Sequence, residues 1–244
     1  MLDSVVLTYV LFILVLMFGV FVQALAGFGG TLISMPLGIM LMGMALTKPV
    51  MTIVAWITGV VVIFAEYRHI NWRELLKMVA VMLVGVLAGI WLTGKLQLQF
   101  LLIIYGVVVA AIGVKKFFFP SQGQPPKSVQ NLALAIAGIM QGLFVSGGSF
   151  LAVYAVERLP EKREFRGTVN AVWAMLNTVM IGTYFLNGAM TKEVLTMSGI
   201  AIVPTLVAIW LGGVLTKRVK QQTFLKIVYV ILMVSGAVLL ITNL

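Results

Sequence analysis

The chain has 244 residues, of which 61% are hydrophobic and only 10% are charged. A soluble domain carries about 25% charged residues. The composition therefore excludes a soluble domain and predicts an integral membrane protein. The absence of cysteine excludes disulfides and thiolate chemistry. The net charge of +10 comes from Lys and Arg residues that lie between apolar segments, so we expect these residues to set the membrane topology and expect no nucleic-acid partner.

Ten apolar segments follow one another along the chain. They cover residues 5–27, 31–44, 49–67, 75–94, 99–118, 131–146, 149–157, 167–187, 194–215 and 223–242. Fourteen basic residues fall in one set of connections, and only Lys48, Lys95 and Lys192 fall in the other. The positive-inside rule places the first set in the cytoplasm, so we expect a multi-pass protein of the bacterial cytoplasmic (inner) membrane with both termini outside.

The same rule predicts two hairpins. Lys127 and Arg158 lie on one side of the membrane, so the chain between them must enter and return. Residues 5–47 form a hairpin by the same argument. Residues 149–157 are fewer than the ~20 needed to span a bilayer, which favours a re-entrant arm there. Whether the other arms cross fully is left open.

Each predicted hairpin contains the same motif. Residues 23–31 read QALAGFGGT and residues 141–149 read QGLFVSGGS, 118 positions later. Residues 90–94 and 209–213 match in the same order. The expected fold is therefore all-α, with a first repeat at 1–118, a cytoplasmic linker at 119–131 and a second repeat at 132–244. Each repeat is a broken or re-entrant helical hairpin followed by three transmembrane helices, and the two repeats have inverted topology, as in secondary transporters.

A Gly-Gly pair interrupts a helix and leaves backbone groups without helical partners, which in a membrane survives only inside the protein or along a cavity. Two helices that begin at such breaks direct free N–H groups at one point and favour an anion there. Gly-Gly pairs also serve close helix packing, and Asn and Gln often bond between helices, so those readings stay open. The predicted substrate-binding residues are Gln23, Gly27, Phe28, Gly29, Gly30, Thr31, Ser34, Trp56, Gln141, Ser146, Gly147, Gly148, Ser149, Asn170 and Asn177.

Charged side chains are expected only at segment ends and in connections. All seven acids and all seventeen basic residues fall there in the predicted segments, including Lys48 and Arg166 at matching positions of the two halves. A charge buried in a membrane helix costs about 3 kcal/mol or more, so neutral dipoles are expected to hold the anion. We expect no catalytic residue, no metal and no cofactor.

The two glycine motifs carry a family resemblance. The two copies of the motif resemble the duplicated signature of the sulfite exporter TauE/SafE family. The first copy is residues 27–37, GFGGTLISMPL, and the second is residues 142–149. Length and segment layout extend the likeness over the whole chain, although Tyr154 stands where the first copy has Pro36. The resemblance implies transport of sulfite, a sulfonate or a related organosulfur anion, and it does not fix the substrate.

The expected function is secondary transport of a small anion by alternating access, with no enzymatic activity. An anion channel at the same site is the first alternative. An intramembrane serine hydrolase using Ser146 or Ser149 is the less favoured one, because no His, Lys, Asp or Glu lies in either core hairpin to serve as a base. The expected partners are the anion and membrane lipid, and homodimer formation stays open.

Overall fold

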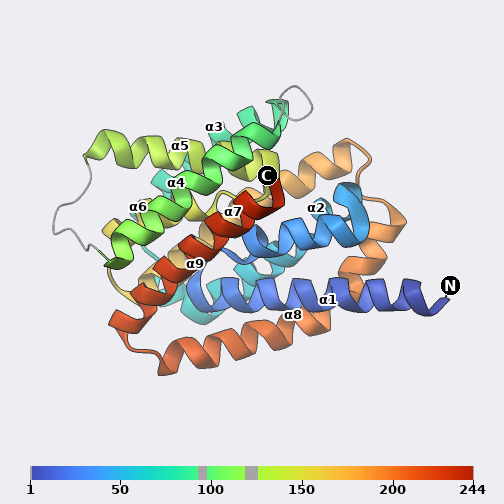
Figure 1. The fold of residues 1–244 in the computed structure, drawn as a ribbon. Coiled ribbons are helices and arrows are strands. Elements are labelled where there is room, and N and C mark those ends of the chain that lie inside the picture. Colours follow the sequence, from blue (N-terminus) through green and yellow to red (C-terminus); the bar gives the residue numbers. More distant parts are fainter. Residues whose placement is uncertain (1, 93–97, 119–125, 244) are drawn as a thin grey trace.

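The computed structural model describes residues 2–92, 98–118 and 126–243, and these residues form helices and no strand (Figure 1). The helices are α1 (Leu2–Ala26), α2 (Gly30–Glu66), the short 3-10 helix η1 (Tyr67–His69), α3 (Trp72–Leu92), α4 (Leu98–Phe118), α5 (Lys127–Phe144), α6 (Gly148–Arg158), α7 (Lys162–Leu186), α8 (Lys192–Arg218) and α9 (Gln221–Asn243).

Six helical segments of the described chain are long and apolar enough to cross a membrane, which confirms an all-α membrane protein. They are Val6–Ala26, Gly30–His69, Trp72–Leu92, Lys162–Leu186, Lys192–Arg218 and Gln221–Val238. By contrast, α6 has 11 residues and is only about 16 Å long at 1.5 Å per residue. The second hairpin, α5–α6, is therefore too short in its returning arm to span the bilayer.

Helices from the two halves of the chain pack together in pairs. The most extensive contacts join α4 to α9, α3 to α5, α2 to α7 and α1 to α8. Figure 1 shows α1 and α8 side by side along one edge of the bundle, with α2 and α7 within it. Glycines permit the closest approaches, since a Cβ on Gly89 of α3 would lie only 2.4 Å from the Ile139 carbonyl oxygen of α5.

The predicted segments 31–44 and 49–67 correspond to two helices that meet at Gly43 and together make up α2. The helix is interrupted at Gly43, whose φ of 73° and ψ of 165° are not helical. Lys48 consequently lies inside a helix and not in a connection. The linker predicted at 119–131 is partly outside the described residues, and its last residues belong to α5, which begins at Lys127.

The expectation that every charge lies at a segment end or in a connection is wrong for Lys48 and Arg166. Because α7 begins at Lys162, before the predicted segment 167–187, Arg166 lies in its second turn and is only 3% exposed. Glu66, at the end of α2, is equally buried and accepts a hydrogen bond of 2.8 Å from Arg166. Burial is tolerated because opposite charges are paired and hydrogen-bonded there.

Candidate functional site

The first break separates α1 from α2 over three residues. Gly27 and Gly29 have φ values of 87° and 85°, in the left-handed region that favours glycine. Gly29 is the N-cap of α2, and no side chain caps that helix start. The first N–H groups of α2 are therefore left without a capping side chain.

The second break separates α5 from α6. Val145 has a φ of 55° and a ψ of 30°, an uncommon conformation for a β-branched residue. Its N–H still donates to the Gln141 carbonyl at 2.9 Å, which ends α5 with a left-handed cap. Gly147 is the N-cap of α6, which also starts without a side-chain cap.

The two breaks meet inside the bundle. A Cβ built on Gly148 would lie 3.4 Å from the Gly29 nitrogen and 3.1 Å from the Phe28 Cβ. The starts of α2 and α6 therefore converge, and a small cavity lies between them. It is lined by Gln23, Phe28, Gly29, Thr31, Ala55, Gln141, Val145, Gly148, Trp173 and Asn177. Its volume of about 10 Å³ has room for about one water molecule.

The two matching glutamines of the motifs have different partners. Gln141 is fully engaged, since its Nε2 donates to Asn177 Oδ1 at 2.9 Å and its Oε1 accepts from the Gly147 N–H at 3.2 Å. Gln23 is 4% exposed and lines the same cavity, but its Nε2 has no hydrogen-bond partner. The residue 118 positions before Asn177 is Gly59, which has no side chain to offer Gln23.

Seven of the predicted residues thus line the cavity, and the others lie elsewhere. Gly30 and Gly147 serve packing, because a Cβ on either would lie about 2 Å from the carbonyl oxygen of Gly19 or Ala137, respectively. Ser34 lines an adjoining small cavity that also contains Gly30 and Gln23. Its hydroxyl donates to the Gly30 carbonyl at 2.9 Å.

Four further predicted residues are buried around the breaks without lining the cavity. The Gly27 carbonyl accepts a hydrogen bond from Trp173, and the Ser146 hydroxyl donates to the Phe144 carbonyl at 2.8 Å. Ser149 is fully buried, and its hydroxyl has no hydrogen-bond partner. Asn170 donates to the Arg166 carbonyl at 2.9 Å.

Trp56 lies away from the cavity. Its indole N–H donates to Thr178 at 2.9 Å on the exposed side of α2 and α7, beside an apolar pocket. Ala55, the preceding residue, lines the cavity instead, because adjacent helical residues point in directions about 100° apart.

Three lining residues are absent from the predicted set: Ala55, Val145 and Trp173. The Trp173 indole N–H donates to the Gly27 carbonyl at 2.9 Å and so fixes the first break to α7. Trp173 shares a helix face with Asn170 and Asn177, and that periodicity was the available signal. No cluster of three His, Asp or Glu side chains lies in the part of the chain that the structure describes, so no metal site is assigned.

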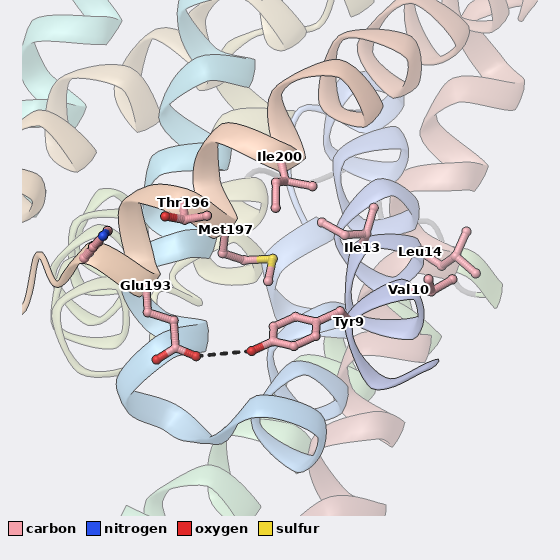
Figure 2. Close-up of a pocket in the computed structure, with 9 residues that line it drawn as sticks. Tyr9, Val10, Ile13, Leu14, Glu193, Thr196, Met197 and Ile200 are labelled. Atoms are coloured by element: carbon pink, nitrogen blue, oxygen red, sulfur yellow. Dashed lines mark hydrogen bonds between the residues drawn. The ribbon is translucent and has the colours of Figure 1, made fainter. Parts of the chain in front are cut away.

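A much larger groove of about 800 Å³ lies on the outside of the bundle, between α1 and α8 (Figure 2). Its walls are mainly apolar and include Val10, Ile13 and Leu14 of α1 and Met197 and Ile200 of α8. Polar groups gather at one end, where the Tyr9 hydroxyl lies 3.5 Å from a Glu193 carboxylate oxygen. This groove is separate from the cavity at the breaks, since no residue lines both.

Comparison with known proteins gives one family and one relative. A family model described as "Sulfite exporter TauE/SafE" matches residues 11–239. The chain is also 23% identical over 174 residues to the "Probable inner membrane transporter protein TsaS" of Comamonas testosteroni, covering 70% of this chain and 73% of that protein. No solved structure matches.

Proposed function

The chain belongs to the sulfite exporter TauE/SafE family, as its glycine motifs indicated, and we propose that it transports a small sulfur-containing anion by alternating access. The substrate is sulfite, a sulfonate or a related organosulfur anion. The similarity to a probable inner membrane transporter supports a place in the bacterial inner membrane. The distribution of basic residues supports an orientation with both termini outside.

The observation that carries the proposal is the unpaired amide nitrogen of Gln23 beside two helix starts. Its Nε2 is a buried donor without a partner, and leaving such a group unpaired costs about 1–3 kcal/mol. The N-termini of α2 and α6 add partial positive charge at the same cavity. An oxyanion that enters would accept hydrogen bonds from these groups, so the site favours an anion over a cation.

The size of the cavity supports a carrier over a channel. A space of about 10 Å³ holds about one water molecule and is too small for a sulfite ion or a sulfonate. Substrate can therefore reach the Gln23 amide only after helices move apart. A channel would need an open path through the site, whereas a carrier passes through such a closed state.

The pairing of helices supports two inverted repeats. A shift of about 118 residues carries α1 onto α5, α3 onto α8 and α4 onto α9, and it carries the two parts of α2 onto α6 and α7. Under this shift the contact of α1 with α8 becomes the contact of α5 with α3, and both contacts are present. This exchange is the arrangement expected for repeats around a central site.

No observation favours the serine hydrolase. The Ser149 hydroxyl has no hydrogen-bond partner among the described side chains, so no base activates it, and Ser149 does not line the cavity. The Ser146 hydroxyl donates to a backbone carbonyl.

Transport by purified protein in liposomes tests the proposal. Uptake of labelled sulfite, sulfoacetate and taurine is measured against sulfate and simple carboxylates, with and without unlabelled substrate inside. Saturating uptake that internal substrate accelerates is the expected result. Uptake proportional to concentration without such acceleration would make the protein a channel, and no uptake of any sulfur anion would overturn the proposal.

Gln23→Leu tests the site within the same assay. The variant is expected to lose most transport because the free donor is removed. Gln222→Leu, an exposed change at the start of α9, is the matched control and is expected to transport normally.

A further inference from the structure

Two basic residues hold the ends of the helices that lead into the breaks. Lys48 Nζ donates to the carbonyls of Gly142 and Leu143 at 3.2 and 2.9 Å, in the last turn of α5. Arg166 Nε donates to the Ala24 carbonyl, in the last turn of α1, at 2.5 Å. Lys48 and Arg166 are 118 positions apart, and so are Ala24 and Gly142. The same contact is therefore made twice.

Both contacts satisfy groups that the breaks leave open. The last four carbonyls of a helix lack intrahelical partners, and a cation there also interacts favourably with the helix dipole. At the end of α1, Thr216 caps the Leu25 carbonyl at 3.1 Å, and Trp173 caps the Gly27 carbonyl. Without Arg166 or Lys48, a buried carbonyl at each break would lose its partner.

Each contact joins a different pair of helices to the centre of the bundle. Lys48 belongs to α2 and reaches α5, which packs on α3. Arg166 belongs to α7 and reaches α1, which packs on α8. Since α2 and α7 pack on each other, one bond ties this central pair to α3–α5, and the other ties it to α1–α8.

The two contacts lie on opposite sides of the cavity. Arg166 bonds to Glu66 at the end of α2, and Lys48 lies 18 residues earlier on α2, about 27 Å away along the helix. Ala55, which lines the cavity, lies between them on the same helix. A helix that separates from the centre at one of these points would open the cavity toward one face of the membrane only.

We propose that Lys48 and Arg166 are the two gate residues of the transporter, one on each side of the cavity. This inference rests on the proposed alternating access. With both basic side chains bound to the opposing helix end, both gates are closed and the cavity is sealed. Release of Lys48 from α5 opens the face on which Lys192 lies, and release of Arg166 from α1 opens the face on which Lys217 lies.

The two gates differ in how the basic residue is held within the central pair. Arg166 is held additionally by Glu66 at 2.8 Å, and Glu66 also accepts a bond of 2.9 Å from Arg163. Among the described residues, the Lys48 ammonium group bonds only to these two backbone carbonyls. Because Glu66 lies on α2, its bond orients Arg166 within the central pair and does not reach α1, which Arg166 holds through the Ala24 carbonyl.

The absence of cysteine in the chain makes a single engineered thiol a clean probe. Ala55→Cys places the thiol in the cavity wall, and a membrane-impermeant thiol reagent is added to either face of sealed vesicles of known orientation. Lys48→Met is expected to raise the labelling rate at least about tenfold from the Lys192 face only, because it removes two charge-assisted hydrogen bonds and the loss of one already corresponds to about that factor. Arg166→Met combined with Glu66→Gln is expected to raise it from the Lys217 face only.

The controls separate gating from loss of folding. Lys192→Met and Lys217→Met remove a positive charge from each face without removing a contact to the end of α1 or α5, and they are expected to leave labelling unchanged. Lys48→Arg and Arg166→Lys keep a donor and are expected to label more slowly than the Met variants. Labelling from the same face in both Met variants, or no change in either, would overturn the proposal. Because no substrate is needed, a failure to transport sulfur anions would leave this result interpretable.

Discussion

Gly29 and Gly148 face each other across the centre of the bundle, and a Cβ on Gly148 would lie 3.4 Å from the Gly29 nitrogen. These residues are 119 positions apart and come from different halves of the chain. Their closeness brings the starts of α2 and α6 to one cavity, where the amide nitrogen of Gln23 has no hydrogen-bond partner. Each half of the chain alone would hold only half of this site.

A side chain at Gly148 should close the site. Gly148→Leu is expected to abolish transport, because its Cβ would already lie 3.1 Å from the Phe28 Cβ and the rest of the side chain would fill the cavity. Uptake in liposomes measures the loss. Gly199→Leu on α8 is the control, since nothing lies within 4 Å of a Cβ there. Normal uptake by Gly148→Leu would show that substrate does not pass between the breaks.

The two glutamines should respond differently to the same substitution. Gln141→Leu leaves Asn177 and the Gly147 N–H without their partner, so it is expected to lower the free energy of unfolding by about 1–3 kcal/mol. Gln23→Leu removes a donor that has no partner and should leave that free energy unchanged or higher. Thermal unfolding in detergent measures both. Equal destabilisation by the two variants would mean that Gln23 is a packing residue.

The sequence predicted the breaks because the same glycine pair, with a glutamine before it and a hydroxyl residue after it, occurs at matching positions of the two halves. It also predicted that Gln23 and Gln141 would lie together, since both stand at the same distance before a break. The difference between them depends on a third residue, Asn177, and on the absence of a counterpart at Gly59. Comparison of the two halves position by position would have exposed that difference.

Charge burial could not be predicted from segment boundaries. Arg166 was placed in a connection because it closes a run of basic residues, yet α7 begins four residues earlier, at Lys162. What decides its position is the pairing with Glu66 and with the Ala24 carbonyl, and both partners are distant in sequence. In the same way, the polar indole N–H made Trp56 a candidate, but the sequence could not show that this side chain lies on the exposed side of α2.

Tyr154 should stabilise the second hairpin without taking part in transport. It is fully buried, and its hydroxyl donates to a Glu74 carboxylate oxygen at 2.6 Å, joining α6 to α3. Tyr154→Phe is expected to cost about 1.5–3 kcal/mol, as for other hydrogen bonds to charged groups. The KM for transport is expected to stay unchanged, because Tyr154 does not line the cavity. Unfolding and uptake are measured together, and a raised KM with unchanged stability would contradict this role.

The buried pair of Glu66 and Arg166 should show strong coupling. Glu66→Gln leaves the Arg166 charge buried without its carboxylate, which typically costs about 3–5 kcal/mol. Arg166→Met alone leaves Glu66 with Arg163, whose side chain is 43% exposed, and is expected to cost less. The double variant is expected to recover much of the loss from Glu66→Gln, since neither buried charge remains unpaired. A double-mutant cycle on the free energy of unfolding measures this coupling. Costs that simply add would mean that the two charges are stabilised separately, Arg166 by the Ala24 carbonyl and Glu66 by Arg163.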